Sequence, residues 1–269
     1  MSTFLAGCDS MEFGWLLMSW IPAVRAMSRK YDHTVVVCRK ENEYLYRDFT
    51  DRFFHHEINR RPDRWYANWD PIVECKIPDV LKKKINADKV WEPEKKYCMN
   101  RPLEYVRYGE RTKDWFHLVI HARAENKYGQ TGRNWGEKRY YRLVKAIRKQ
   151  MNIRVACIGT NAYKIPHVYD RTNIPLSQLC DILHSSKLLI GESSGPMHLG
   201  ELCGIPRVVW TDDSKHKILG NRTNKWRYKK YWHPFKTPVT VIDEYGWRPP
   251  DKFVFDTVTD TLRKVRRKK

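Results

Sequence analysis

The stretch Leu188–Trp210, LLIGESSGPMHLGELCGIPRVVW, constrains the fold more than any other part of the chain. The apolar residues that open it predict a buried strand, and Arg207–Trp210 predicts a second one. Between them, Pro196 suits the first turn of a short helix over Met197–Leu202, and Gly204 suits the cap at its end. The order strand, turn, helix, strand is that of a parallel α/β unit.

The polar turn before that helix predicts an anion-binding site. A helix that starts over a turn directs free N–H groups and the positive end of its dipole at one point. Ser193, Ser194 and His198 can each donate a hydrogen bond there, beside Gly195 and Met197. Many units of this shape only pack against their neighbours, but these donors favour a phosphate site. Because the two serines are adjacent, they are alternatives for the contact.

The charge of the chain predicts a polyanionic partner. Its 269 residues carry 51 Lys+Arg against 31 Asp+Glu, which gives a net charge of +20. Such an excess is larger than solubility requires, and it favours nucleic acid, an anionic membrane surface or a phosphorylated glycan as the partner.

The cysteines and the N-terminus indicate the compartment. The seven cysteines are scattered and form no C-x-x-C pair, which argues against a zinc site and favours a reducing environment. The N-terminus has no signal-peptide pattern, and the most apolar stretch, Phe13–Val24, is too short to span a bilayer. We therefore expect a soluble, cytoplasmic protein, in the host cytoplasm if the source is viral. No sequence feature predicts an oligomeric state.

Hydrophobic periodicity predicts alternating strands and helices along the rest of the chain, and Pro22 is expected to kink its helix or to set the effective start. The predicted strands are Thr3–Cys8, Thr34–Cys38, Phe53–Ile58, Phe116–His121, Arg154–Ile158 and Val239–Ile242. The predicted helices are Trp15–Tyr31, Glu41–Phe49, Glu137–Met151, Leu176–Ser185 and Asp256–Arg266, with a short element at Val80–Ile85. This order predicts an α/β protein of two halves with a boundary near residue 113.

The motif ESSGPMHLGELCGIPRVVW resembles the donor-site signature of GT-B glycosyltransferases, particularly the heptosyltransferase-like group. In that group a D-S-G-P-x-H-L-x-x-A-x-G-x-P pattern binds the diphosphate of a nucleotide-sugar. The residues that match it are Gly195, Pro196, His198, Leu199, Gly204 and Pro206. Glu192 stands in place of the acid of the pattern, and Ser194 is an extra residue.

The resemblance implies the GT-B architecture, in which two Rossmann-like domains face a cleft. Residues 1–113 would bind the acceptor, and residues 114–245 would bind the nucleotide-sugar donor, with a UDP-sugar favoured. The C-terminal helix and its basic tail, residues 246–269, would cross back and pack on the N-terminal domain.

A second part of the donor site is expected in the loop that follows Phe116–His121. Ligands lie at strand ends in open α/β sheets, and the R-x-x-E and G-R-N-W sequences of this loop resemble the entry loop of the same glycosyltransferase group. We expect Arg123, Arg133 and Asn134 to contact phosphate or sugar. The alternative is a solvated basic loop.

Acidic and small residues could complete the donor site. Gly159 and Thr160 end a predicted strand and are expected to face the nucleotide base. Glu201 could accept hydrogen bonds from ribose hydroxyls, or be a surface helix residue, and Asp212 and Asp213 could reach the sugar. No D-x-D pair follows a strand as metal-dependent GT-A enzymes require, so we expect transfer without a metal or other cofactor.

The catalytic base is expected in the N-terminal loop GCDSMEFGW, which resembles the acceptor-side loop of related glycosyltransferases. In those loops an acid deprotonates the acceptor hydroxyl. Glu12 is the first candidate and Asp9 the second, and the alternative for either is a helix-capping acid. Met11 replaces the glycine usual in this motif.

Basic residues mixed with aromatic ones indicate where a polyanionic acceptor would bind. Basic side chains contact phosphates, and aromatic rings stack on extruded or single-stranded bases. The alternative is a solvated charged face above a core of aromatic residues. The candidate residues in two clusters are Arg60, Arg61, Arg64 and Trp65, and Arg222, Lys225, Arg227, Lys229 and Lys230.

Three functions fit these patterns. The first is transfer of a sugar to a hydroxymethylated pyrimidine in DNA, as in bacteriophage base glycosyltransferases of similar architecture. The second is a glycosyltransferase that acts on lipopolysaccharide or a capsular glycan. The third is a non-catalytic nucleic-acid-binding protein on a GT-B-like frame.

Overall fold

The computed structural model describes residues 1–7, 11–56, 76–93, 101–124, 131–160, 162–216 and 221–267. The chain divides into two compact units, Met1–Val106 and Arg107–Lys269. This boundary lies slightly before the predicted one near residue 113, because the segment that follows Val106 is hydrogen-bonded to the second unit. The Tyr108 N–H donates to the Leu202 carbonyl at 3.0 Å, and the Thr112 N–H donates to Ser185 Oγ at 2.9 Å.

The first unit is built on a parallel four-stranded sheet with the order β3-β2-β1-β4. Its strands are β1 (Thr3–Gly7), β2 (His33–Cys38), β3 (Arg52–His55) and β4 (Lys89–Trp91). Its helical elements are α1 (Phe13–Trp15), a π-helical turn (Leu16–Trp20), α2 (Ile21–Ser28), a 3-10 helix (Lys40–Tyr46) and α4 (Asp79–Ile85). The predicted strands and helices of this unit are confirmed, except that residues 40–46 form a 3-10 helix and β4 was not predicted.

Pro22 has the predicted effect on its helix. The π-helical turn ends at Trp20, and α2 begins at Ile21 with Pro22 in its first turn. Since proline has no N–H to donate, a helix tolerates it at this position and not further along.

The second unit is built on a parallel six-stranded sheet with the order β7-β6-β5-β8-β9-β12. Its strands are β5 (Leu118–His121), β6 (Val155–Gly159), β7 (Tyr169–Thr172), β8 (Leu189–Glu192), β9 (Arg207–Trp210) and β12 (Val239–Ile242). This is the strand order of a Rossmann sheet. The first three strands are added toward one edge and the next three toward the other, so the strand order reverses between the first and fourth strands, here β5 and β8. Ligands of open α/β sheets bind at that switch point, outside the carboxyl ends of the strands.

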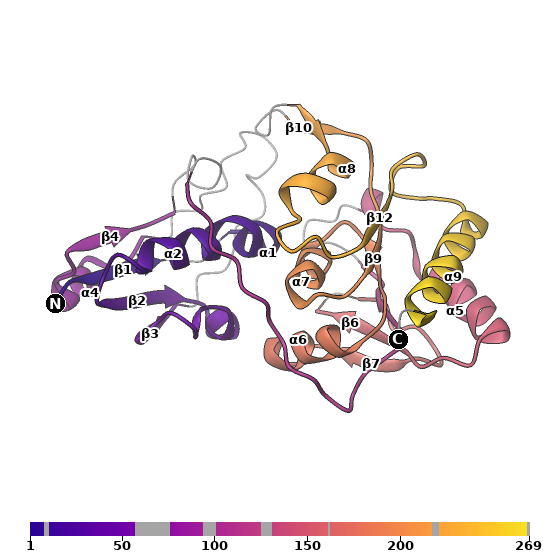
Figure 1. Cartoon of the computed structure of the whole chain (residues 1–269), viewed down its shortest axis with the longest axis horizontal. Helices are drawn as coiled ribbons and strands as arrows, with labels where there is room; N and C mark the ends of the chain where they lie inside the picture. The colour runs from indigo at the N-terminus through magenta and orange to yellow at the C-terminus, as the bar shows by residue number, and fades with distance from the viewer. Residues whose placement is uncertain are drawn as a thin grey trace. The chain divides into compact units, whose positions relative to one another are not determined.

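Helices cover both faces of the second sheet, with α5 and α9 on one side and α6 and α7 on the other (Figure 1). The helices are α5 (Glu137–Gln150), α6 (Leu176–Ser185), α7 (Gly195–Cys203), α8 (Asn224–Trp226) with a following π-helical turn (Arg227–Tyr231), and α9 (Asp251–Arg267). A short 3-10 helix (Thr131–Arg133) and the antiparallel pair β10 (Lys215–His216) and β11 (Arg222–Thr223) complete the described elements.

The motif that opened the sequence analysis folds as predicted. Strands β8 and β9 flank α7, and Gly204 ends that helix with a left-handed φ of 79°. This left-handed backbone conformation favours glycine, and a Cβ at this position would also displace the Arg107 guanidinium, which lies 2.6 Å away.

The C-terminal helix packs within its own unit. Val254, Val258 and Leu262 line one face of α9 and are fully buried in the core of the second unit, and α9 packs on α5. The apolar face of α9 is therefore covered by the second unit, and the expected crossing of residues 246–269 to the N-terminal domain stays a prediction. In the ranges given above, no helix combines the length and apolarity needed to cross a membrane.

Candidate functional site

The switch point of the second sheet brings together two loops that the sequence analysis singled out. His121 ends β5, and it pairs with Gly191 of β8. Ser194 Oγ lies 3.0 Å from His121 Nδ1 and donates to the Glu192 carbonyl at 2.9 Å. The polar turn therefore lies where an open sheet of this order binds its ligand.

The start of α7 presents a small set of backbone donors. Ser194 is the N-cap residue in extended conformation, and Pro196 has no N–H. The N–H groups of Met197 and His198 donate to the Ser194 carbonyl at 3.0 and 3.4 Å, and the Met197 side chain is buried. The N–H groups of Ser194 and Gly195 are therefore the backbone candidates for an anion, and Met197 supports the turn by packing.

His198 and Ser193 are joined through Tyr228, which lies within the predicted basic cluster of residues 222–230. The Tyr228 hydroxyl lies 2.9 Å from Ser193 Oγ, and the His198 ring stacks on the Tyr228 ring at 5.1 Å between centroids and 8° between planes. Burial, followed by the charges of Arg207 and Arg227, lowers the pKa of His198 to about 3. His198 is thus a neutral imidazole that can offer a hydrogen bond but no positive charge.

Glu192 ties the arginine-bearing loop to the sheet. Its buried carboxylate accepts the Trp135 N–H at 2.6 Å and the Tyr140 hydroxyl at 2.6 Å. Burial raises the pKa of Glu192 to about 7. Asn134 is also buried and donates to the Ala124 carbonyl, so it holds the ends of the loop together.

The other predicted donor residues surround the same strand ends. Arg123 forms an isolated bridge with Ala162, which joins the segments that follow β5 and β6. The Arg133 guanidinium lies over the Trp247 ring at 5.0 Å. Gly159 has a φ of 117°, and a Cβ there would lie 2.7 Å from the His121 ring, so glycine is required for β6 to end beside His121.

Thr160 is exposed directly after β6. Glu201 is fully buried and pairs with Arg207. Its other oxygen accepts the Phe235 and Thr237 N–H groups at 3.0 and 3.4 Å. Glu201 is therefore not the surface residue that was considered, and its carboxylate is occupied by contacts inside the protein. These contacts hold the loop at Phe235 and Thr237 to α7.

The basic cluster at residues 222–230 is divided by the fold. Arg222, Lys229 and Lys230 are exposed, and Lys225 pairs with Asp243 at 2.7 Å. Arg227 is only 4% exposed and lies over the Trp232 ring at 4.9 Å, so it is not part of a surface for DNA. The predicted residues Arg60, Arg61, Arg64 and Trp65 lie outside the described residues.

The N-terminal loop is described at Glu12 but not at Asp9. Glu12 is the N-cap residue of α1, its side chain is exposed, and its carboxylate makes no capping hydrogen bond. The carboxylate therefore occupies the capping position without bonding to the helix N–H groups. Met11 is buried beside it, which shows that the departure from the glycine of the motif is accommodated by packing.

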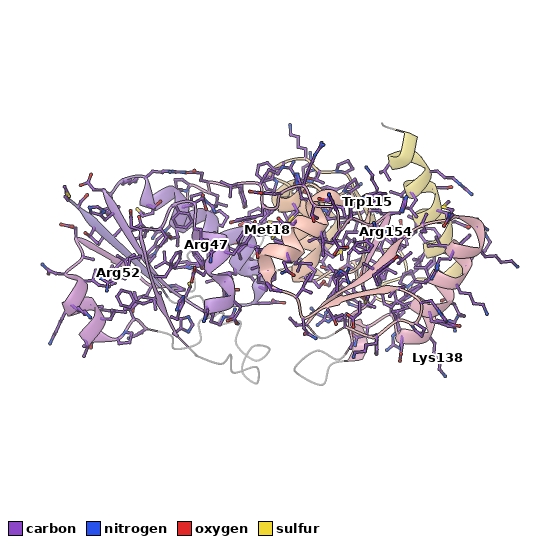
Figure 2. All side chains as sticks on the ribbon, turned by 90° about the horizontal axis from the view of Figure 1, so that it is seen from below. Met18, Arg47, Arg52, Trp115, Lys138 and Arg154 are labelled. Atoms are coloured by element: carbon purple, nitrogen blue, oxygen red, sulfur yellow. The ribbon has the colours of Figure 1, made fainter. Side chains whose placement is uncertain are left out.

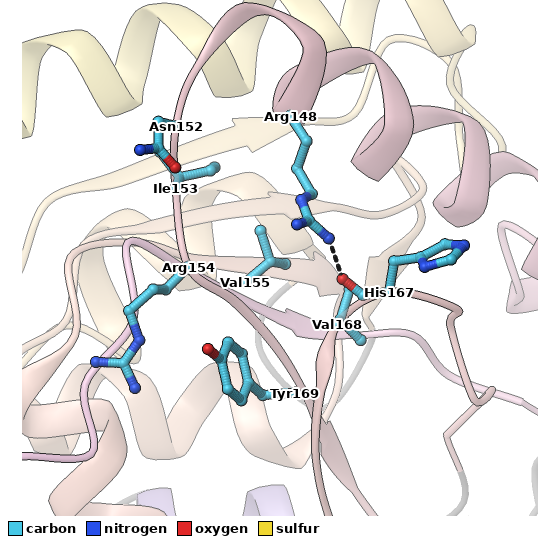
Figure 3. A pocket seen from close by; sticks show the side chains of 8 residues that line it. All are labelled: Arg148, Asn152, Ile153, Arg154, Val155, His167, Val168 and Tyr169. Atoms are coloured by element: carbon cyan, nitrogen blue, oxygen red, sulfur yellow. Dashed lines mark hydrogen bonds between the residues drawn. The ribbon is translucent and has the colours of Figure 1, made fainter.

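A hollow of about 350 Å³ lies at the opposite, amino end of the second sheet (Figure 3). Arg148 and Arg154 flank it over a floor that includes Val155, and Tyr169 lines its edge. Arg154 also lies 5.7 Å from the Trp115 ring (Figure 2). None of the predicted site residues lines this hollow, and parallel sheets rarely bind substrates at their amino ends.

The sheet order defines the class of fold: two Rossmann-like α/β units, the second of which has the polar turn Ser193–Gly195 at the switch point of its sheet. Among solved structures, the chain is similar to Escherichia coli ADP-heptose lipopolysaccharide heptosyltransferase II, with a TM-score of 0.63 and 12% identity over 98% of this chain and 99% of that one. It is equally similar to a glycosyl transferase family 9 protein from Veillonella parvula, with a TM-score of 0.63 and 11% identity over 98% and 97%.

A third similar structure is the Escherichia coli heptosyltransferase WaaC with ADP, with a TM-score of 0.57 and 11% identity over 97% of this chain and 100% of that one. No protein-family model matches the chain. No curated protein matches it in sequence. At these identities the likeness establishes the fold, and the predicted GT-B fold of two Rossmann-like domains is confirmed.

Proposed function

We propose that the protein is a glycosyltransferase that takes its sugar from a nucleotide-sugar. The observation that carries this proposal is the meeting of the Ser193–Gly195 turn with His121 at the switch point, on a GT-B fold. Serine hydroxyls, two N–H groups and the start of α7 suit the diphosphate of such a donor. The heptosyltransferase structure that contains ADP supports a nucleoside diphosphate as the leaving group.

The reaction needs few groups from the protein. The bond between the anomeric carbon and the diphosphate breaks, and its electron pair leaves with the diphosphate. The acceptor hydroxyl oxygen bonds to the anomeric carbon, and its proton passes to a base. We assign Glu12 as that base, with Asp9 as the alternative, because the Glu12 carboxylate is exposed and makes no capping hydrogen bond.

Transfer is proposed to proceed without a metal. The positive end of α7 and the arginines around it can neutralise the diphosphate. Activity that persists at full rate in EDTA is expected, and activity that disappears in EDTA and returns with magnesium or manganese would refute this part.

We propose a hydroxymethylated pyrimidine in DNA as the acceptor. Support comes from the net charge of +20 and from the exposed residues Arg222, Lys229 and Lys230. The Arg222 guanidinium lies over the half-exposed Trp226 ring at 5.2 Å, so a stacking surface lies beside these charges. The similar heptosyltransferase structures favour a second acceptor, the lipopolysaccharide glycan.

One experiment separates these acceptors. The protein is incubated with hydroxymethylated DNA or with a lipopolysaccharide core acceptor, each with UDP-sugars and ADP-heptose, and products are identified by mass spectrometry. A nucleoside mass increase supports the DNA acceptor, and glycosylated core supports the second. Donor hydrolysis or transfer excludes a non-catalytic binding protein, whereas no product with any pair would refute the proposed function.

Glu12→Gln tests the assigned base. Loss of the proton acceptor should lower kcat by at least about 100-fold, the usual scale for general-base catalysis, while nucleoside diphosphate binding is unchanged. Steady-state kinetics and calorimetry measure the two effects. Near-normal kcat in this variant would remove Glu12 from the role and leave Asp9 to be tested.

A further inference from the structure

Arg227 is a buried cation for which the described residues provide no ion-pair partner. Its side chain is 4% exposed, and among the described residues no carboxylate forms an ion pair with it. Its Nε has no hydrogen-bond partner there. Asp212 is the carboxylate whose charge raises the pKa of Arg227, and one of its oxygens accepts from Ser214 and Asn224 at 2.9 and 2.8 Å. Burying a guanidinium without a paired carboxylate is costly, so an anion that binds there would stabilise this group.

A second guanidinium increases this cost. Arg133, from the loop after β5, is close enough to Arg227 for its charge to lower the pKa of Arg227, after burial as the larger cause. Like charges placed together without a described counter-ion are stabilised when an anion binds both.

The position of Arg227 places this charge near the Ser193–Gly195 turn. It begins the π-helical turn Arg227–Tyr231, in which the Trp232 N–H donates to the Arg227 carbonyl at 2.7 Å. The next residue, Tyr228, contacts Ser193 through its hydroxyl and His198 through its ring. Single π-helical turns occur frequently at functional sites.

We infer that Arg227 and Arg133 together bind the diphosphate of the nucleotide-sugar. This inference rests on the proposed function and moves Arg227 from the acceptor surface to the donor site. When the bond to the sugar breaks, its electron pair adds negative charge to the diphosphate, which both guanidinium groups can stabilise through charge-assisted hydrogen bonds. The Ser193–Gly195 turn then supplies neutral donors, and the two arginines supply the charge.

The test compares Arg227→Met, Arg227→Lys and Arg133→Met with wild type. Binding of inorganic pyrophosphate, UDP and ADP is measured by calorimetry, and unfolding midpoints are measured with and without pyrophosphate. Arg148→Met, at the distant hollow, is the control that removes one positive charge elsewhere.

Arg227→Met should bind pyrophosphate roughly 10- to 100-fold more weakly, the range for loss of one charge-assisted contact. Its unfolding midpoint without ligand should stay equal to wild type or rise, because an unpaired buried charge has been removed. A purely structural arginine would instead lower the midpoint and leave binding intact.

Arg227→Lys keeps the positive charge but loses the several N–H donors of the guanidinium, so it should weaken pyrophosphate binding less than Arg227→Met. This variant still tests the inference if Arg227→Met does not fold. If wild type binds pyrophosphate and both Arg227 variants bind it equally well, the inference is wrong while the proposed function stands. If wild type binds none of the three ligands, the proposed donor site itself is wrong.

Discussion

The arginines at the two ends of the second sheet differ in how their charge is balanced. At the amino end, Arg171 binds Asp114 at 2.7 Å and Arg154 lies 3.7 Å from the same carboxylate. At the carboxyl end, Arg133 and Arg227 contact tryptophan rings, and no described carboxylate pairs with either. Both ends are rich in arginine and aromatic rings, so composition does not distinguish them.

The difference distinguishes arginines that stabilise the fold from arginines available to a ligand. A partly exposed arginine with a carboxylate partner costs little and fixes a loop, as Arg171 does. A buried arginine without one is costly, and the cost is reasonable only if a ligand offsets it. The anion site should therefore lie at the carboxyl end, although the hollow of Figure 3 lies at the other.

The largest expected effect comes from breaking a balanced pair in the core. Glu201→Gln leaves Arg207 fully buried without its counter-charge and should destabilise the protein by about 3–5 kcal/mol. Urea unfolding measures this. The double variant Glu201→Gln with Arg207→Met removes both charges and should recover most of the loss. A single variant within about 1 kcal/mol of wild type would contradict the assigned structural role.

The acid at the carboxyl end should give stability an unusual dependence on pH. Burial raises the pKa of Glu192 to about 7 from an ordinary value of 4.5. Between these values the folded state holds a proton that the unfolded state lacks. The contribution is therefore complete below pH 4.5 and is lost as the pH rises to about 7, by about 3 kcal/mol in total.

Glu192→Gln removes this titration and keeps an acceptor for the Trp135 N–H. The difference in unfolding free energy between wild type and this variant should fall from about pH 5 to about pH 8. Burial lowers the pKa of His121 and His198 to about 3, which acts in the opposite direction at acid pH, but both proteins share it. A difference that does not change with pH would show that Glu192 is ionised in the folded state throughout.

The smallest effect is expected at the amino end. Asp114→Asn removes the shared partner of Arg154 and Arg171, but all three side chains are about one-third exposed. The loss should be about 0.5 kcal/mol and should shrink in high salt. Pyrophosphate binding should not change. A marked change in pyrophosphate binding would contradict the proposal that the anion binds only at the carboxyl end of the second sheet.

The sequence predicted the elements whose physical signal is local. Residues Leu188–Trp210 contain an apolar run, a proline, a capping glycine and a second apolar run, and each determines one boundary of β8, α7 or β9. In contrast, β4 and β7 are short strands with polar residues, so no apolar run marks them. They form because a neighbouring strand offers hydrogen bonds.

In the proposed site, the sequence predicted the position of the polar turn but not which of the nearby side chains are buried. The turn at Ser193–Gly195 follows from residue types alone. The run WRYKKYW has the same composition whether it coats a surface or folds inward, so the burial of Arg227 and the contact of Tyr228 with Ser193 required tertiary structure. Glu201 was misassigned for the same reason, because its partner Arg207 lies in the following strand.

The π-helical turn at Arg227–Tyr231 has a consequence for comparing this chain with its relatives. Geometrically, such a turn is an α-helical turn that contains one extra residue. Deleting one residue there would restore the α-helical pattern and rotate the residues on one side of it by about 100° relative to the other. A protein of this fold that has an ordinary α-helical turn in this segment should therefore align with this chain with a one-residue gap.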